Sequence, residues 1–205
     1  MKELWLFTSR YPYGLREAFI ENEIKILCDR FDRVRVFPEH IDTHIRPMPP
    51  NAELCSPITD PFKAASLGVV LRSTKLLWPL LRSLWVDKPS IFTLLKHWSV
   101  LRSRMAQFIN RAALLRNGLM AEYDPERVVV YSYWTHDWVT VLGLLREDDP
   151  RLTFFSRAHG YDIFEEQNVD HWIPFRAFQL EHVQRVHCAR SEERRVGKEC
   201  RLTCR

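Results

Sequence analysis

Aromatic and charged side chains are concentrated in the loop that follows the first apolar run, Glu3–Thr8. Residues 9–19 contain two tyrosines, two arginines, a glycine and a glutamate ahead of a helical pattern. A helix N-terminus favours anions, and aromatic rings beside hydroxyl and guanidinium groups suit sugar hydroxyls. The candidate binding residues here are Tyr11, Tyr13, Gly14, Arg16 and Glu17. An ordinary polar connection is the competing interpretation.

A second group, residues 131–138, reads Tyr-Ser-Tyr-Trp-Thr-His-Asp-Trp between a predicted strand and a predicted helix. Stacked rings with neighbouring hydroxyls suit the face and the hydroxyl groups of a sugar. The candidate binding residues here are Tyr133 and Trp134. We expect Ser132 or Thr135 to cap the helix. The alternative is that Trp134 and Trp138, four residues apart, belong to the core.

A third group, residues 157–162, reads Arg-Ala-His-Gly-Tyr-Asp and follows a strand predicted over 152–156. We predict that His159 lies at a strand end and faces the ligand crevice of an α/β sheet. Its neutral imidazole could bond a hydroxyl or stabilise developing charge, which makes it the candidate catalytic residue. The candidate binding residues here are Arg157, Gly160 and Asp162. A purely structural histidine is the alternative.

Residue spacing excludes several common phosphate and metal sites. The six glycines lie at positions 14, 68, 118, 143, 160 and 197, so neither GxGxxG nor the P-loop pattern can occur. The sequence has no DxD, HExxH or GxSxG pattern. His40 and His44 lie four apart in a proline-rich stretch with only Asp42 nearby, which argues against a metal site. We predict no metal ion and no bound cofactor.

The elements that must position these groups alternate between strand and helix. Strands are predicted over 3–8, 34–37, 52–55, 127–131, 152–156 and 184–188, and helices over 17–31, 136–146 and 175–181. Such β-loop-α-β units build parallel sheets with right-handed crossovers. The predicted fold class is therefore α/β, a Rossmann-like parallel sheet with flanking helices and an inserted helical segment.

The inserted segment, residues 62–120, shows apolar residues at helical spacing, and Pro79 is expected to kink or restart its first helix. The apolar arc of the first helix is Leu67, Val70, Leu71, Leu77, Trp78, Leu81, Leu84 and Trp85. The apolar side of the second helix is Phe92, Leu95, Trp98, Leu101, Met105, Phe108, Ala112 and Leu115. These arcs either pack on the sheet or lie on another surface.

Charge is unevenly distributed along the 205 residues, whose formal net charge is +4. Residues 61–116 have ten basic residues and one acidic residue, a net charge of +9. A basic helical block with tryptophans suits an anionic membrane surface. Nucleic-acid binding is a weaker alternative, because the tryptophans lie on the apolar stripes and do not alternate with the cations. We predict no nucleic-acid partner.

Taken together, the three groups resemble the N-terminal domain of glycosyltransferase family 4, which has the GT-B fold. The residues of the resemblance are Tyr11, Pro12, Tyr13, Gly14, Glu17, Phe19, Glu23, Tyr131, Ser132, Tyr133, Trp134, residues 157–162, Pro174, Phe175 and Arg176. The similarity covers most of residues 1–189 and is weak over 40–125. Its most specific part is the order of the Tyr-Pro-Tyr-Gly loop and the later His-Gly-Tyr-Asp stretch.

The resemblance implies a retaining, metal-independent transfer of a sugar from a nucleotide-sugar to a glycan or a lipid-linked acceptor. It implies that this domain holds the acceptor, that His159 lies at the interdomain cleft, and that Gly14 approaches the donor phosphates. The second domain of the family, which holds the nucleotide-sugar, has no counterpart here, so the chain alone is expected to be inactive. The alternative is a stand-alone sugar-binding or interaction module without catalysis.

The last residues, 190–205, show no helix or strand period and resemble translated adapter sequence fused to the chain. We therefore expect the native domain to be 1–189 and the remainder to be a non-native or disordered tail. The sequence has no apolar run near the roughly 18 residues of a membrane span and no signal-peptide pattern. The predicted location is the cytoplasm, with peripheral contact to the inner membrane face as an extension.

Overall fold

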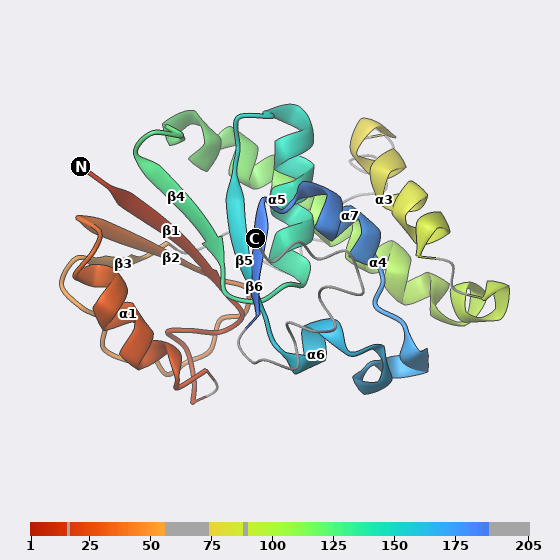
Figure 1. Cartoon of the computed structure of the whole chain (residues 1–205), viewed down its shortest axis with the longest axis horizontal. Coiled ribbons are helices and arrows are strands. Elements are labelled where there is room, and N and C mark those ends of the chain that lie inside the picture. The colour runs from red at the N-terminus through yellow and green to blue at the C-terminus, as the bar shows by residue number, and fades with distance from the viewer. Residues whose placement is uncertain (16, 56–73, 88–89, 189–205) are drawn as a thin grey trace.

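A six-stranded, all-parallel sheet forms the centre of the molecule (Figure 1). The computed structural model describes residues 1–15, 17–55, 74–87 and 90–188. The strands are β1 (Glu3–Thr8), β2 (Arg33–Pro38), β3 (Ala52–Leu54), β4 (Val128–Ser132), β5 (Phe154–Ala158) and β6 (Arg185–Cys188), in the order β3-β2-β1-β4-β5-β6. Helices flank this sheet, which confirms the predicted α/β Rossmann-like fold.

Helices cover both faces of the sheet, as parallel sheets require. They are α1 (Ile20–Cys28), α3 (Thr74–Val86), α4 (Ile91–Asn117), α5 (Asp137–Asp148), α6 (Gly160–Ile163) and α7 (Arg176–His182). On one face, Leu4 and Leu6 of β1 pack with Ile20 of α1. On the other face, Trp5 and Phe7 join a larger core formed mainly by α3, α4, α5 and α7. The alternation along β1 follows from the two-residue period of a strand.

The sheet changes its winding direction between β1 and β4. β1 pairs in parallel with both β2 and β4, so the chain builds outward to β3 on one side and to β6 on the other. In open α/β sheets, ligands bind beyond the strand carboxyl ends at such a switch point. The loops after β1 and β4 flank this point, and they carry two of the residue groups that the sequence singled out.

Some predicted boundaries and caps were wrong. β5 ends at Ala158, so Arg157 belongs to the strand, and α6 places Asp162 in a helix. The cap of α5 is His136, whose Nδ1 accepts from the Asp137 backbone N–H at 2.8 Å. Thr135 cannot serve there because its hydroxyl bonds the Arg157 carbonyl oxygen at 2.9 Å.

The apolar arcs predicted for the helical segment are only partly buried. Toward the core, α3 presents Leu76, Leu80 and Leu84, whereas Trp78 and Trp85 are exposed. The buried residues of α4 begin at Leu101, and none of the ten helical residues before it is buried. Among the described residues, no helix is long and apolar enough to cross a membrane. The assigned helix α3 also continues through Pro79 without a restart. The expected residues Leu67, Val70 and Leu71, like the tail 190–205, lie outside the described residues.

Gly143 allows α5 and α7 to approach closely. A Cβ atom at this position would lie 2.7 Å from Phe178 Cε1 and 3.2 Å from His182 Cβ. We expect Gly143→Ala to lower the free energy of unfolding by about 1–3 kcal/mol through overpacking, despite the better helix propensity of alanine. Urea unfolding would measure it. Gly118→Ala is the control, because its Cβ would meet only Leu114 O at 3.6 Å. Equal stability of the two variants would contradict close packing at Gly143.

Candidate functional site

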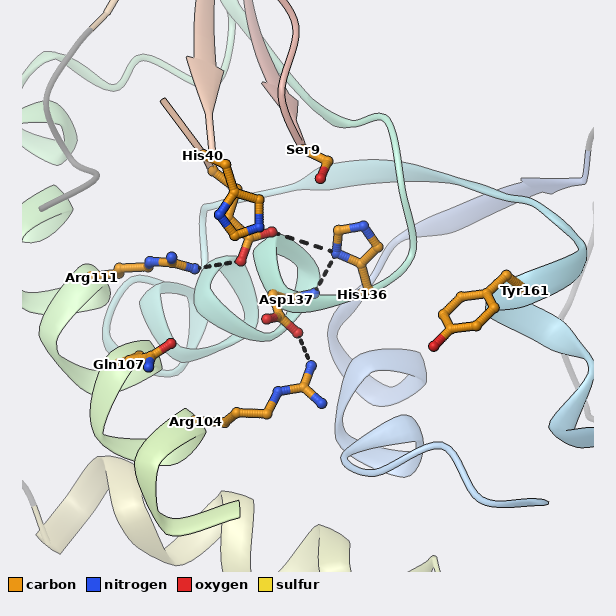
Figure 2. A pocket seen from close by; sticks show the side chains of 9 residues that line it. Ser9, His40, Arg104, Gln107, Arg111, His136, Asp137 and Tyr161 are labelled. Carbon is orange, nitrogen blue, oxygen red and sulfur yellow. Dashed lines mark hydrogen bonds and ion pairs between the residues drawn. The ribbon is translucent and has the colours of Figure 1, made fainter. Parts of the chain in front are cut away.

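A cavity of about 460 Å³ opens beside the switch point of the sheet (Figure 2). Loops that follow β1, β2 and β4 meet there, and residues of α4, α6 and the start of α5 complete the wall. The lining residues are Ser9, Glu39, His40, Arg104, Gln107, Arg111, His136, Asp137 and Tyr161. A larger cavity, about 810 Å³, lies between α3 and α7 and takes only Glu147 from α5. The smaller cavity is the candidate site because of its place at the strand carboxyl ends.

Two ion pairs fix the charged wall of the candidate cavity (Figure 2). Arg111 Nη1 lies 2.9 Å from Glu39 Oε1, and both side chains are buried. The Arg111 guanidinium also lies 5.5 Å from the centre of the Trp138 ring. Arg104 pairs with Asp137. Burial alone would raise the pKa of Asp137, but Arg104 and the other positive groups around it, Arg111 among them, together outweigh burial, and the pKa is lowered. The wall therefore presents ionised groups in fixed positions.

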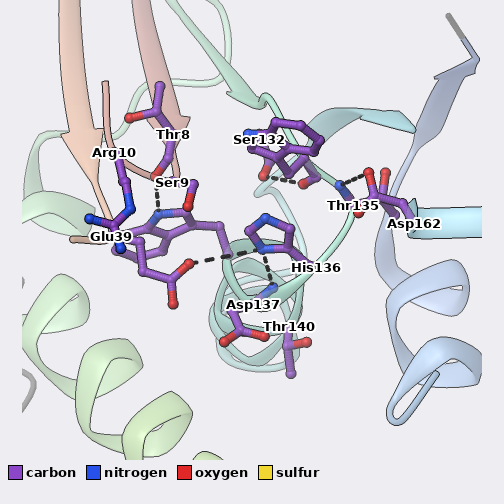
Figure 3. A network of polar contacts seen from close by, with 12 residues as sticks. Thr8, Ser9, Arg10, Glu39, Ser132, Thr135, His136, Asp137, Thr140 and Asp162 are labelled. Carbon is purple, nitrogen blue, oxygen red and sulfur yellow. Dashed lines mark hydrogen bonds and ion pairs between the residues drawn. The ribbon is translucent and has the colours of Figure 1, made fainter. Parts of the chain in front are cut away.

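His136 places an imidazole between the two pairs. Its Nδ1 accepts from the Asp137 backbone N–H and lies 3.9 Å from Glu39 Oε2 (Figure 3). A ring nitrogen that accepts a hydrogen bond carries no proton, so in this arrangement the ring N–H of His136 is at Nε2. His136 thus offers a donor at Nε2, and its orientation is fixed by the start of α5.

The loop after β1 is held by the carboxylate of Glu17. Its oxygens accept from the backbone N–H groups of three consecutive residues, at 3.3 Å from Ser9, 2.6 Å from Arg10 and 2.7 Å from Tyr11. The indole N–H of Trp134 also donates to it. Glu17 adopts a positive φ of 62°, an uncommon conformation for a residue with a side chain. These four contacts join the loops after β1 and β4.

The polar side chains around the loop after β4 are also satisfied internally. Ser132 Oγ donates to the Trp134 carbonyl oxygen at 2.7 Å. The Trp138 indole N–H donates to the Thr8 carbonyl oxygen at 2.9 Å (Figure 3). Trp138 is buried, so the core interpretation was right for this residue. The two loops therefore form a rigid frame beside the cavity.

An aromatic cluster lies on the α1 side of the same loops. The His159 ring is 4.1 Å from the Trp134 ring and is stacked on Tyr133 at 5.6 Å between centroids. Phe19 stacks on Tyr133 at 5.7 Å and leaves half of its surface exposed. Trp134 also stacks on His136 at 6.0 Å, which connects the aromatic cluster with the cavity.

Arg157 and Glu23 form an ion pair that contacts the Tyr133 hydroxyl of this cluster. Arg157 Nη1 donates to Glu23 Oε2 at 2.7 Å and to the Tyr133 hydroxyl at 3.0 Å. The Tyr133 hydroxyl donates to the same Glu23 oxygen at 2.9 Å. Burial, followed by the Glu23 charge, raises the pKa of Tyr133. Tyr133 therefore stays neutral and acts as a fixed link between α1 and β5.

Asp162 fixes the strand end that carries His159. Its Oδ2 accepts from the His159 backbone N–H at 3.1 Å and from that of Thr135 at 3.4 Å. His159 Nδ1 lies 3.6 Å from the same oxygen. Burial would raise the pKa of Asp162, but the His159 side chain, His136 and Arg176 outweigh burial, and the pKa is lowered. The buried carboxylate orients His159 and joins the loop after β4 to α6.

The structure brings most of the predicted residues together, but in different roles. Trp134 and His159 meet in the aromatic cluster, while Tyr11 and Tyr13 are buried and line no part of the candidate cavity. Burial raises the pKa of Tyr11 to about 12, and Arg46 lies 5.1 Å from its ring centre. The remaining candidates are placed as follows: Glu17, Tyr133, Arg157 and Asp162 support the loops, Gly160 begins α6, Gly14 adopts a φ of 62°, and Arg16 lies outside the described residues.

Several cavity residues were not predicted from the sequence. Arg104, Gln107 and Arg111 recur at i, i+3 and i+7 on α4, a polar stripe that could have been noticed beside the apolar one. Glu39 and His40 directly follow β2, a position that the same strand-end argument marks. Among the described residues, no group of three or more His, Cys, Asp or Glu could hold a metal ion.

Comparisons with known proteins leave the family of the chain open. No protein-family model matches the sequence, and no curated protein matches it significantly. The functional argument therefore depends on the residues and their geometry.

Removal of the Glu17 carboxylate should loosen the loop after β1. We expect Glu17→Ala to lower the free energy of unfolding by about 2–3 kcal/mol, because several buried donors lose a charged acceptor. Thermal or urea unfolding would measure the loss. Glu126→Ala, in the exposed turn before β4, is the control and should change stability little. A Glu17 variant as stable as the control would show that the carboxylate does not hold the loop.

Asp162, which is buried, and Asp87, which is partly buried, should respond to pH in opposite directions. The lowered pKa of Asp162 contributes stability that is present above the unfolded pKa of about 3.9 and is lost as pH falls toward the folded value. Asp162→Asn should therefore be less stable than the parent at neutral pH, and the difference should shrink in acid. Urea unfolding across a pH series would show it.

The control for this pH series is Asp87, whose pKa is raised mainly by burial. Stability is lost as pH rises from the pKa of Asp87 in the unfolded chain toward its raised pKa in the folded protein, because the folded protein resists ionisation of this carboxyl. The parent should therefore gain stability relative to Asp87→Asn as pH falls, opposite to the Asp162 pair. If both pairs changed in the same direction, the charge environments described here would be wrong.

Proposed function

We propose that this chain is the acceptor-holding part of a retaining glycosyltransferase, which moves a sugar from a nucleotide-sugar to a glycan or a lipid-linked acceptor. The observation that carries the proposal is the cavity at the switch point, whose charged and hydroxyl-bearing walls adjoin the aromatic cluster of Trp134 and His159. The similarity of the loops to glycosyltransferase family 4 supports the same reading.

A polyhydroxylated ligand needs donors and acceptors at fixed positions, since an unpaired buried polar group costs free energy. The cavity offers the guanidinium of Arg104 and the amide of Gln107 from α4 and the phenol of Tyr161 from α6. The loops after β2 and β4 add His40 and His136. Because Arg104 pairs with Asp137, its guanidinium is already oriented before a ligand arrives. Such an arrangement favours neutral hydroxyls over a free anion.

The aromatic cluster supplies the apolar contact that a sugar ring also requires. Phe19 is half exposed above Tyr133, and His159 retains part of its surface beside Trp134. In this proposal His159 bonds a hydroxyl of the transferred sugar or stabilises charge that develops during transfer. Asp162 is a positioning residue, because it contacts the His159 backbone and ring and reaches no ligand group itself.

The nucleotide-sugar is a co-substrate in this proposal and is held mainly by residues outside the described cavity. Glycine spacing excludes both common glycine-rich phosphate loops from the whole sequence. The similarity to glycosyltransferase family 4 assigns to Gly14, whose φ is positive, the approach to the donor phosphates.

Sugar binding at the cavity can be tested with the purified chain. Saturation-transfer NMR against a panel of glycans and lipid-linked sugars should detect binding, which Gln107→Ala and Tyr161→Ala should each weaken about tenfold, the effect of losing one good contact. Tyr161 is more than half exposed, so its loss should not unfold the protein. Gln184→Ala is the matched control, since Gln184 is exposed just before β6, at the opposite end of the sheet.

Transfer is measured separately, as nucleotide release from a panel of nucleotide-sugars in the presence of each bound glycan. Glycan binding without any transfer, also after the chain is supplied with a nucleotide-sugar-binding domain, would favour the alternative of a sugar-binding module. No glycan binding, or equal loss in the Gln184 control, would overturn the assignment of the cavity.

A further inference from the structure

A cavity of about 410 Å³ lies on the α1 side of the sheet. α1 forms one wall, the segment before β3 forms another, and Tyr11 from the loop after β1 completes the lining. The lining residues are Tyr11, Glu21, Ile24, Lys25, Pro47, Met48 and Pro49, and none of them lines the candidate sugar cavity. Tyr11, which the sequence singled out as a binding residue, therefore belongs to a different cavity.

The Tyr11 hydroxyl is buried and has no hydrogen-bond partner within the described part of the chain. A buried polar group without a partner costs free energy, which one hydrogen bond would recover. Burial, opposed by Arg46 and assisted by Glu21, raises the pKa of Tyr11 to about 12. The hydroxyl therefore keeps its proton and is a donor for an acceptor that the described residues do not supply. The influence of Glu21 and Arg46 on it locates the hydroxyl beside the α1 wall of the cavity.

The wall before β3 combines a fixed backbone with one adaptable side chain. The backbone N–H of Arg46 donates to the Pro12 carbonyl oxygen at 3.0 Å, and that of Ala52 donates to the Pro49 carbonyl oxygen at 3.0 Å. Met48, between these two anchors, packs against the core cluster that contains Tyr11. Its unbranched side chain has three rotatable bonds, so it can move aside for a ligand group that reaches the hydroxyl.

The charged groups of the lining leave an ammonium uncompensated. Glu21 is compensated by Arg46, whose Nη1 lies 2.7 Å from Glu21 Oε1. Lys25 lies one turn further along α1, is exposed and forms no ion pair with any described residue. The cavity thus offers an unpaired hydroxyl donor and an unpaired cation, while Ile24, Met48 and the two prolines make the rest of its lining apolar.

We propose that this cavity binds a small organic carboxylate with an apolar body. The carboxylate accepts from the Tyr11 hydroxyl and pairs with the Lys25 ammonium, and the apolar body packs on Ile24 and Met48. Hydrogen bonds to an ionised acceptor are stronger than neutral ones, which favours a carboxylate over an alcohol. The apolar lining favours an organic acid over inorganic phosphate, because ligand cavities of this kind bury apolar surface around a few polar contacts.

This cavity is separate from the candidate sugar cavity, so the proposal goes beyond the proposed function and stands without it. The test is calorimetric titration of the full chain with hexanoate, 1-hexanol, acetate and inorganic phosphate. Hexanoate should bind about tenfold more tightly than 1-hexanol, which has the same chain length without the charge. From acetate to hexanoate, affinity should rise about fourfold for each methylene that becomes buried. Added salt should weaken the binding of hexanoate.

Tyr11→Phe removes only the unpaired hydroxyl and should weaken hexanoate binding about tenfold. Without ligand, this variant should be as stable as the parent in urea, because no hydrogen bond is lost. The matched control for stability is Tyr133→Phe. Its hydroxyl is bonded to Glu23 at 2.9 Å and to Arg157 at 3.0 Å, so this variant should be less stable than the parent.

Lys25→Gln should weaken hexanoate binding several-fold and remove most of its salt dependence. The matched control is Lys2→Gln, an exposed lysine ahead of β1 that is not part of the lining, and it should leave binding unchanged. Glycan binding by the Lys25 variant should stay at the parent level. Failure of the carboxylate site therefore leaves the assignment of the sugar cavity intact.

Several results would overturn the proposal. One is the absence of hexanoate binding, and another is equal affinity for hexanoate and 1-hexanol. Phosphate that binds as tightly as hexanoate would show a general anion site without an apolar subsite. Unchanged hexanoate binding by Tyr11→Phe would remove the hydroxyl from the site. A loss of stability in the same variant without ligand would show that the hydroxyl already has a partner within the chain.

Discussion

The site depends on one buried carboxylate that links two loops. Glu17 accepts from three consecutive backbone N–H groups after β1 and from the indole of Trp134 after β4. Without it, those donors would have to find water or stay unpaired. Because Trp134 stacks on both His159 and His136, the same carboxylate sets the relative position of the aromatic cluster and the cavity.

The fold followed from sequence patterns because burial is periodic. Apolar runs and helical stripes located every strand of the sheet, including the short β3, to within a few residues. The boundary of β5 was harder, since Arg157 is polar yet lies in the strand, where Glu23 and Tyr133 satisfy its guanidinium. Such long-range partners, more than a hundred residues apart for Glu23, leave no local signal.

The site was only partly predictable for a related reason. The loops after β1, β4 and β5 were recognised from strand-end position and composition, but residue type did not reveal orientation. Tyr11 was a predicted ligand contact and is buried, whereas Arg104 and Arg111, which were counted only as part of the basic segment 61–116, line the cavity. Their pairing with Asp137 and Glu39 joins α4 to loops far away in the sequence.

The continuity of α4 has a geometric consequence. One helix, Ile91–Asn117, has Leu95 on its exposed half and Arg104 at the cavity, and a helix advances 1.5 Å per residue. The two positions are therefore held about 14 Å apart along the axis, a spacing set by the helix. Because α4 is one continuous helix, a contact that holds its first turns in place also holds Arg104 at the cavity. Insertion or deletion of residues between Leu95 and Arg104 would change the distance between them along the helix axis. It would also rotate one position relative to the other about that axis.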